Sequence, residues 1–485
     1  MKHRFLSTLM NLSFKCLLFF TVTLWCATTL SQQTPNIVVF MADDAGMDFG
    51  CYGNDAIKTP NIDRLASEGI KFTQAFLTTP QCSPSRTSIL SGQFAHTIGT
   101  EDLHNPLDSV TKLVPHYIKE AGYFSGLMLK GHLGEFGHRQ FDWQDSGYSS
   151  YANGSWYEEI KENTRNFLNS ANDRPFFLWV GFIDPHRSYQ NDPIGAPMVH
   201  DPKKVNVPPY LVDDDLTRKD LAAYYDEIHR MDGNIGKILD ELEIAGKMEN
   251  TIVLFLSDNG FPFPRGKGTL YDSGIHSPLI VKWTGKIRPN SVYEGLVSTI
   301  DLAPTFLELA GLEPPEAFFG RSVKRILMEP EKYPDHNKYV FAEKNWHDWD
   351  DYLRSVRTKK YKLIYDAYPH LILGATDGYD APSYESLIKA KRAGSLTKAQ
   401  MQIFEHPRPT IELYDVENDP FELNNLAELP QTYSQQISEL YAALVQWQEA
   451  TNDHHPNTRR MTDTMDRVTG ANYGKFGSNR YIDKD

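Results

Sequence analysis

Cysteine is scarce in this chain of 485 residues, which has only four. Cys16 and Cys26 lie in an apolar stretch near the N-terminus, so the remainder of the chain holds only Cys51 and Cys82. Two cysteines can form at most one disulfide bond, which excludes a scaffold held together by disulfides. The Cys/His spacings typical of zinc sites are also missing. The fold must therefore depend on a hydrophobic core.

Positive charge is also in short supply, because 49 Lys and Arg stand against 63 Asp and Glu and give a formal net charge of −14. This balance argues against a general nucleic-acid-binding protein. It still allows a small anionic substrate, since a local basic pocket can lie within an acidic protein. Hydrophobic residues make up 40% of the chain and aromatic residues 12%, enough for one large domain and a smaller one.

No apolar run is long enough to span a bilayer comfortably. The N-terminal run CLLFFTVTLWCATTL follows the basic residues Lys2 and Arg4 and precedes small residues. We interpret residues 1–31 as a secretory signal peptide, with an uncleaved anchor as the alternative. The protein is then expected to be secreted or periplasmic, without stable membrane insertion.

Apolar strand-like runs alternate with helical patterns, which predicts an α/β fold with a large, mostly parallel sheet flanked by helices. Four of the runs end abruptly in polar residues. They are NIVVFMADD, YFSGLMLKGH, PFFLWVGFIDPH and TIVLFLSDNG. Ligands of open α/β sheets bind at the carboxyl ends of the strands. We therefore expect a functional site there, built from Asp43, Asp44, Lys130, His132, Asp184, His186, Asp258 and Asn259.

The pattern changes after about residue 330. KYVFAE, YLRSVRT, KYKLIYD and IELYDV are typical of short antiparallel strands, and QTYSQQISELYAALVQWQEATND of an amphipathic helix. The sequence thus predicts a catalytic domain over 32–330 and a smaller α+β subdomain with an antiparallel sheet over 331–453. Residues 454–485 have little apolar content and are expected to form an extended tail.

Four of the polar residues at the strand ends, Asp43, Asp44, Asp258 and Asn259, offer only oxygen atoms. A single Asp at a strand end is more often a helix cap or a solvated turn. Two pairs at two strand ends favour a metal site, because neighbouring carboxylates would otherwise repel one another. Oxygen ligands without histidine or thiolate favour Ca²⁺ or Mg²⁺ over Zn²⁺.

Cys82 begins the segment CSPSRTSILSG, which has the pattern of a helix start. Arg86 follows one turn later, and a helix N-terminus with a guanidinium favours an anion. A thiolate is a poor Ca²⁺ ligand, however. Cysteine catalysis with a histidine base would leave the oxygen cluster without a role.

These residues carry a resemblance to a known family. Cys82-Ser83-Pro84-Ser85-Arg86 resembles the Cys-x-Pro-x-Arg signature of the type I sulfatases. ADDAGMDFGCYGN, LSDNG, RGKGTLYDSGIHSPLIVKW and IELYDVENDPFELNNLA are similar to further segments of that family, so the resemblance extends from about Asn36 to Gln448. LKGHLG departs from the family pattern, because Gly131 separates Lys130 from His132 and Leu129 replaces a usual Gly.

The resemblance implies an alkaline-phosphatase-like fold and a modified nucleophile. Cys82 would be oxidised to formylglycine by a formylglycine-generating or an anaerobic sulfatase-maturating enzyme. Its hydrated aldehyde would be an oxygen nucleophile beside one Ca²⁺ per chain. The ligands would be Asp43, Asp44, Asp258, Asn259 and the converted residue 82.

The same resemblance implies roles for the other site residues. Arg86 would hold the nucleophile, which Asp258 would help to deprotonate. Lys130, Lys267 and His186 would contact the sulfate, and His186 or Lys267 would protonate the leaving group. His132 would take the proton whose removal expels sulfate from residue 82.

The segment from Tyr365 to Ile411 is similar to the heparan N-sulfatase (sulfamidase) branch. This implies a sulfated carbohydrate as substrate, either N-sulfoglucosamine or an O-sulfated glycan such as an algal polysaccharide. Candidate substrate contacts are His104, His276, His347, Trp346 and Trp349. The alternative is a surface or packing role for the histidines and core packing of the smaller domain for the tryptophans.

Two other functions are compatible with these residues. A phosphoesterase or phosphonate hydrolase could use the same scaffold, although the Cys-x-Pro-x-Arg signature argues for sulfate. An unconverted Cys82 would leave a Ca²⁺-dependent glycan-binding protein.

Overall fold

The structure is a computed structural model that describes residues 34–145, 159–189, 198–456 and 467. The predicted signal peptide, residues 1–31, lies outside the described residues, as does most of the predicted tail. Among the described helices, none combines the length and apolar character that a membrane span requires.

An eight-stranded sheet with the order β5-β4-β6-β1-β7-β8-β2-β9 forms the centre of the larger part. Only β8 runs antiparallel to its two neighbours, so the sheet is mixed and mostly parallel, which confirms the predicted fold class. Its strands are β1 (Asn36–Ala42), β2 (Ile70–Phe72), β4 (Phe124–Leu129), β5 (Trp143–Gln144), β6 (Phe176–Gly181), β7 (Thr251–Ser257), β8 (Leu279–Trp283) and β9 (Ser291–Tyr293).

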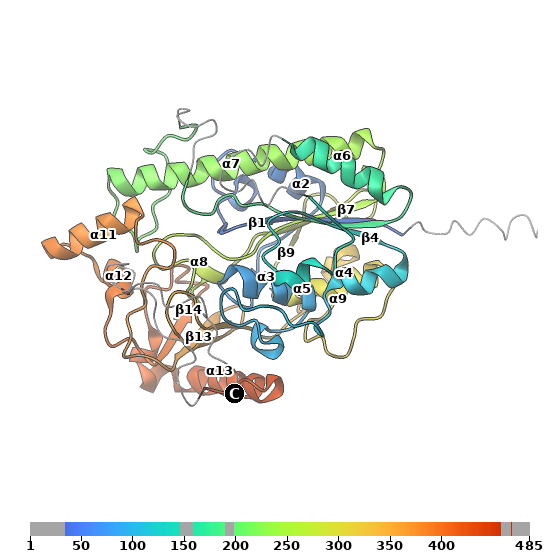
Figure 1. Ribbon diagram of the computed structural model, residues 1–485. Coiled ribbons are helices and arrows are strands. Elements are labelled where there is room, and N and C mark those ends of the chain that lie inside the picture. The colour runs from blue at the N-terminus through green and yellow to red at the C-terminus, as the bar shows by residue number, and fades with distance from the viewer. Residues whose placement is uncertain (1–33, 146–158, 190–197, 457–466, 468–485) are drawn as a thin grey trace, which may run out of the picture.

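Helices cover both faces of this sheet (Figure 1). One face carries α2 (Pro60–Glu68), α6 (Ile160–Ala171) and the long α7 (Asp215–Ile244). The other carries α3 (Cys82–Ser91), α4 (Val114–Ile118), α5 (Gly134–His138) and α9 (Leu302–Leu309). Side chains of a strand alternate between faces, so Val38 packs under α7 while Val39 packs on the side of α9. This double burial explains the continuous apolar strands of the sequence.

Short elements connect these layers. They are the parallel pair β3 (Ala75–Phe76) and β10 (Val297–Ser298), and the helices α8 (Asp272–Ile275) and α10 (Lys324–Met328). Single 3₁₀ turns span Gly50–Tyr52, Ala95–Ile98, Lys119–Ala121, Met248–Asn250, Thr299–Asp301, Pro330–Lys332, Gln402–Phe404 and Leu426–Glu428.

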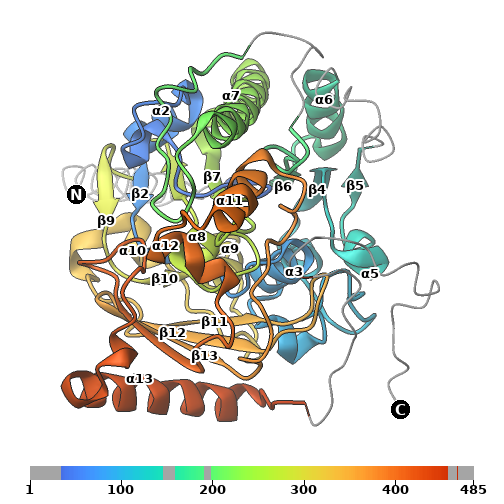
Figure 2. The ribbon, with the colours of Figure 1, turned by 90° about the vertical axis from the view of Figure 1, so that its left-hand side faces the viewer.

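A separate four-stranded antiparallel sheet follows residue 330. Its strands, in the order β11-β12-β13-β14, are β11 (Val340–Lys344), β12 (Leu353–Arg357), β13 (Tyr361–Asp366) and β14 (Ile411–Asp415). The amphipathic helix α13 (Pro430–Thr451) lies along this sheet (Figure 2). Between β13 and β14, α11 (Pro382–Ala393) and α12 (Lys398–Met401) are inserted, and α11 packs against α7.

The register of the large sheet aligns the strand ends that the sequence singled out. Ala42 pairs with Ser257, and both Met41 and Leu129 pair with Gly181. Just beyond these pairs, the backbone N–H of Asp43 donates to the carbonyl of Asp184 at 3.1 Å. The polar ends of β1, β4, β6 and β7 therefore meet at one edge of the sheet.

Candidate active site

Three carboxylates and one amide converge at this edge, and none of them is exposed to solvent. Asp43 and Asp44 follow β1, whereas Asp258 and Asn259 follow β7. The Asn259 side-chain amide donates to Asp44 at 2.5 Å and to Asp258 at 2.8 Å, and the backbone N–H of Asp44 donates to Asp258 at 3.2 Å. Asp44 has φ 73°, a left-handed backbone conformation that is uncommon without glycine. We call these four residues the acidic cluster.

Cys82 lies against this cluster, at the first residue of α3. Its Sγ is 3.5 Å from Asp43 Oδ1, 3.7 Å from Asn259 Oδ1 and 3.9 Å from Asp44 Oδ1. Burial raises the pKa of the thiol well above its usual value. The surroundings therefore disfavour the thiolate on which cysteine catalysis depends. Both Cys82 and Cys51 are free cysteines, so the described structure has no disulfide between them.

Three cations surround the acidic cluster. Arg86 Nε lies 2.7 Å from Asp258 Oδ2, Lys267 Nζ lies 2.8 Å from Asp44 Oδ1, and Lys130 pairs with Asp43. Arg86 Nη2 is buried and has no hydrogen-bond partner in the described structure, although it lies 3.8 Å from Asp43 Oδ1. A buried, partnerless guanidinium nitrogen beside two lysines provides a place for an anion's oxygen atoms.

The carboxylates of the cluster differ in acidity. Burial opposes ionisation of Asp43, but Lys130, His186 and Arg86 outweigh it and hold the pKa of Asp43 well below its usual value. Burial and the neighbouring charge of Asp43 raise the pKa of Asp258 to about 6. Like charges held this close favour a divalent cation as a shared counterion.

The donor set fits a metal ion. Asp43, Asp44, Cys82 and His186 each offer an atom, and these atoms all lie within 4.8 Å of one another. Asp258 and Asn259 add two further oxygen donors through their contacts with Asp44. A set in which carboxylate and amide oxygens predominate suits Ca²⁺ or Mg²⁺.

Two of the predicted histidines border this site. His186 Nε2 lies 3.9 Å from Asp44 Oδ2. His132 follows β4, and its buried Nδ1 has no hydrogen-bond partner among the described residues. Burial and the nearby Lys130 charge lower the pKa of His132 well below its usual value, so its imidazole is neutral at pH 7. The exposed His104 has its ring centroid 4.8 Å from that of His132.

One residue of the site, Asp377, was not predicted. Its Oδ2 lies 2.7 Å from Lys267 Nζ, 3.7 Å from His347 Nε2 and 3.9 Å from His186 Nε2. Asp377 lies between β13 and α11, more than 100 positions from Lys267 and outside any recognisable motif. The only sequence signal was that this stretch resembled one branch of a family.

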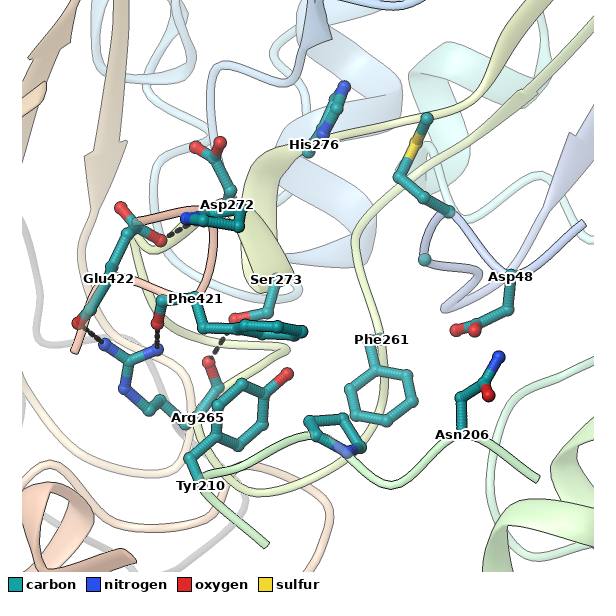
Figure 3. A pocket seen from close by; sticks show the side chains of 14 residues that line it. Asp48, Asn206, Tyr210, Phe261, Arg265, Asp272, Ser273, His276, Phe421 and Glu422 are labelled. Carbon is teal, nitrogen blue, oxygen red and sulfur yellow. Dashed lines mark hydrogen bonds between the residues drawn. The ribbon is translucent and has the colours of Figure 1, made fainter. Parts of the chain in front are cut away.

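Other predicted substrate contacts lie elsewhere. His276 donates from Nε2 to the carbonyl of Thr73 at 3.0 Å, stacks on Phe76, and lines a different cavity of about 200 Å³ (Figure 3). Trp346 and Trp349 are at most 2% exposed. This burial fits the core-packing alternative for both rings, and their contact with a sugar stays a prediction.

The cavity of Figure 3 is lined by Asp48, Asn206, Tyr210 and Phe261 together with His276. Tyr210 and Phe421 lie on one side of it, and Asp48 and Asn206 lie on the other. No residue of the acidic cluster is among those that line it. The cavity is thus separate from the environment of Cys82.

The chain matches the family model "Sulfatase" over residues 35–312 and the model "N-sulphoglucosamine sulphohydrolase, C-terminal" over residues 265–371. It is 33% identical over 456 residues to N-sulphoglucosamine sulphohydrolase of Homo sapiens. The aligned region covers 86% of this chain and 90% of the human protein. It is 28% identical over 475 residues to an ulvan-active sulfatase of Formosa agariphila, with coverages of 87% and 76%.

The fold is similar to that of a solved complex with the substrate D-glucosamine-2-N,6-O-disulfate. The TM-score is 0.66 at 22% identity, and the similarity covers 87% of this chain and 99% of the other. The first family model spans more than half of the chain, and it includes both strand ends of the acidic cluster and Cys82. The chain therefore belongs to the sulfatase family and is an enzyme that hydrolyses bound sulfate.

Proposed function

We propose that this enzyme removes sulfate from a carbohydrate and that Cys82 is the precursor of its nucleophile, formylglycine. The observation that carries the proposal is the position of Cys82 Sγ, within 4 Å of three acidic-cluster residues. An oxygen nucleophile suits such surroundings, whereas a thiol with a raised pKa does not. The names of the relatives, a sulphoglucosamine sulphohydrolase and an ulvan-active sulfatase, support a sulfated sugar as substrate.

Two groups complete this site in the proposal. Formylglycine at position 82 supplies, once hydrated, a geminal diol as oxygen nucleophile. Asp43, Asp44, Asp258 and Asn259 would hold one Ca²⁺, which would supply positive charge that favours a deprotonated oxygen.

The basic side chains of the chain bind and polarise the sulfate. Lys130 pairs with Asp43 and Lys267 with Asp44, so each lysine reaches the acidic cluster through a different carboxylate. Arg86 adds its unpaired Nη2 from α3. Fixed cations in a buried site stabilise the negative charge that develops during sulfate transfer, since little water is present to screen them.

Two histidines move protons in this proposal. His186 is partly exposed and lies between the acidic cluster and solvent, so it is placed to protonate the leaving group; Lys267 is the alternative donor. His132 is kept neutral by burial and by Lys130, and a neutral imidazole can accept the proton whose removal frees residue 82 from sulfate.

The substrate is an N-sulfated or O-sulfated sugar. The match to the C-terminal model of N-sulphoglucosamine sulphohydrolase favours N-sulfoglucosamine, and the similarity to an ulvan-active sulfatase favours an O-sulfated algal glycan. The predicted signal peptide supports an activity outside the cytoplasm, in the periplasm or the medium.

A sulfate-release assay tests the proposal. The protein is co-expressed with a formylglycine-generating enzyme and incubated with glucosamine N-sulfate, glucosamine 6-sulfate, sulfated algal oligosaccharides and 4-methylumbelliferyl sulfate. Matched phosphate monoesters form a second panel. We expect sulfate release from at least one sugar and much slower phosphate release. Faster phosphate release would support the phosphoesterase, and sugar binding without turnover would support a glycan-binding protein.

A further inference from the structure

The charged side chains around Cys82 differ sharply in their exposure to solvent. Lys130 is 5% exposed, and Lys267, Arg86 and the carboxylates of the acidic cluster are fully buried. By contrast, the side chain of His186 is 24% exposed and that of Asp377 is 27% exposed. These two residues therefore lie at the mouth of the site.

Asp377 uses only one of its two carboxylate oxygens in the contacts described above. Lys267, His186 and His347 all approach Oδ2, at 2.7, 3.9 and 3.7 Å. Lys267 is fully buried and also bound to Asp44, so it fixes the orientation of the Asp377 carboxylate. The second oxygen, Oδ1, is in none of these three contacts, and the side chain that carries it is 27% exposed.

The buried cations and the carboxylate of Asp377 act on different parts of a substrate. A sulfate group is attracted to the buried Lys130, Lys267 and Arg86, so the sugar that carries it remains near the mouth. Asp377 repels a second anion there and accepts a hydrogen bond from a donor. A free hydroxyl on the carbon next to the sulfated one is such a donor on a sugar.

Resting on the proposed function, we propose that Asp377 is a specificity-determining residue that requires a free hydroxyl beside the sulfated position. An ether or a second sulfate at that carbon removes the donor and places bulk or negative charge against the carboxylate. A hydrogen bond to a charged acceptor corresponds to a discrimination of about 10- to 100-fold.

The test compares each sulfated sugar with its O-methylated analogue. The probes are glucosamine N-sulfate with O3 free or methylated and glucosamine 3-sulfate with O4 free or methylated. For the wild-type protein, we expect methylation of the preferred sugar to lower kcat/KM by about 10- to 100-fold. In Asp377→Ala, which removes the acceptor and makes room, we expect this penalty to shrink to about threefold or less.

Asp377 also pairs with Lys267, so overall activity will fall in its variants. The methylation penalty is the diagnostic readout, because loss of Lys267 positioning alone lowers both members of a pair equally. Asp377→Asn keeps the size of the side chain and serves as the second variant if Asp377→Ala misfolds. We expect it to show an intermediate methylation penalty. Asp380→Asn, an exposed residue of the same segment, is the control and should keep the wild-type penalty.

An unchanged methylation penalty in both Asp377 variants, or no penalty in the wild type, would overturn this inference alone. Failure of the converted wild-type protein to release sulfate from any probe, including 4-methylumbelliferyl sulfate, would overturn the proposed function and this inference with it.

Discussion

At the scale of single residues, Cys82 shows how surroundings select chemistry. Its thiol is buried against carboxylates, which is unfavourable for a thiolate, and it heads the fully buried helix α3. The same surroundings suit a neutral oxygen group that can share protons with carboxylates. The surroundings of Cys82 therefore suit a residue that is converted before it acts. Replacing its side chain with alanine changes the side-chain volume only slightly, so we expect the core to tolerate the substitution.

Cys82→Ala should abolish sulfate release and leave the fold intact. We expect kcat/KM to fall by at least about a thousandfold, because a nucleophile is lost. The free energy of unfolding should change by only about 1 kcal/mol, since a small side chain is replaced by one slightly smaller. Kinetics and urea unfolding measure the two effects. A variant with full activity would exclude residue 82 as the nucleophile.

Asp48, which lines the cavity of Figure 3, should make stability depend on pH. Burial raises the pKa of Asp48 to about 6, although hydrogen bonds with Asn54 and Tyr225 act to lower it. The folded state then holds this proton more tightly than the unfolded state, so the contribution of Asp48 to stability falls as pH rises from about 4 to about 6. Asp48→Asn removes this titration.

Melting temperatures of the wild type and Asp48→Asn, measured from pH 4 to pH 7, check this prediction. The variant should gain stability relative to the wild type as pH rises. A difference between the two proteins that stays constant with pH would contradict the raised pKa.

A site residue could be predicted only where the sequence around it carries a local signal, such as the end of a strand. Asp43, Asp44, Asp258 and Asn259 each end a buried strand, so sequence pattern and sheet geometry together predict their convergence. Asp377 reaches Lys267 only through tertiary packing of a loop, and nothing in its local sequence differs from a surface turn. The sequence left both interpretations of the tryptophans open, because an aromatic residue in a loop can face either a ligand or the core.

At the scale of elements, the fold class followed from alternating apolar runs and helical patterns, and the antiparallel strands after residue 330 were also predictable. The way in which the second sheet attaches to the first part of the chain could not be predicted, because long-range ion pairs leave no periodic signal in the sequence. Lys362 on β13 is fully buried and lies 2.7 Å from Asp272 Oδ1 at the start of α8. It also donates to the carbonyl of Leu270 at 3.0 Å and pairs with Glu422.

Lys362→Met should destabilise the protein by about 3–5 kcal/mol, because it leaves Asp272 and Glu422 buried without their shared cation. The urea dependence of fluorescence measures this change in the free energy of unfolding. Lys360→Met, which removes a half-exposed lysine just before the same strand, is the matched control and should have a far smaller effect. Equal effects of the two substitutions would show that the Lys362 pairs do not join the sheets.

At the scale of the whole molecule, the site is assembled from both parts of the chain. The acidic cluster, Cys82 and Lys267 come from the part before residue 330, whereas Asp377 and His347 come from the part after it. Residues on both sides of the predicted boundary near residue 330 therefore contribute to the candidate site. The division into two domains at that boundary stays a prediction.

Removal of divalent cations should lower both the stability and the activity of the whole protein. In the proposed site an ion would offset repulsion within the acidic cluster, and an ion present at about 100 times its Kd stabilises a protein by about 2.7 kcal/mol. EDTA should thus lower Tm and stop sulfate release, and added Ca²⁺ should restore both.

Asp258→Ala should lose metal and activity together and should no longer respond to EDTA. Asp240→Ala, an exposed position on α7, is the control and should respond like the wild type. Sulfate release that survives with the acidic cluster emptied of metal would contradict the proposed site.

The most direct test of the central claim is the mass of the peptide that contains residue 82, taken from a preparation that releases sulfate. The account predicts the mass of the formylglycine form, with activity in proportion to the converted fraction across preparations. An active preparation in which this peptide carries only the unmodified cysteine would contradict it.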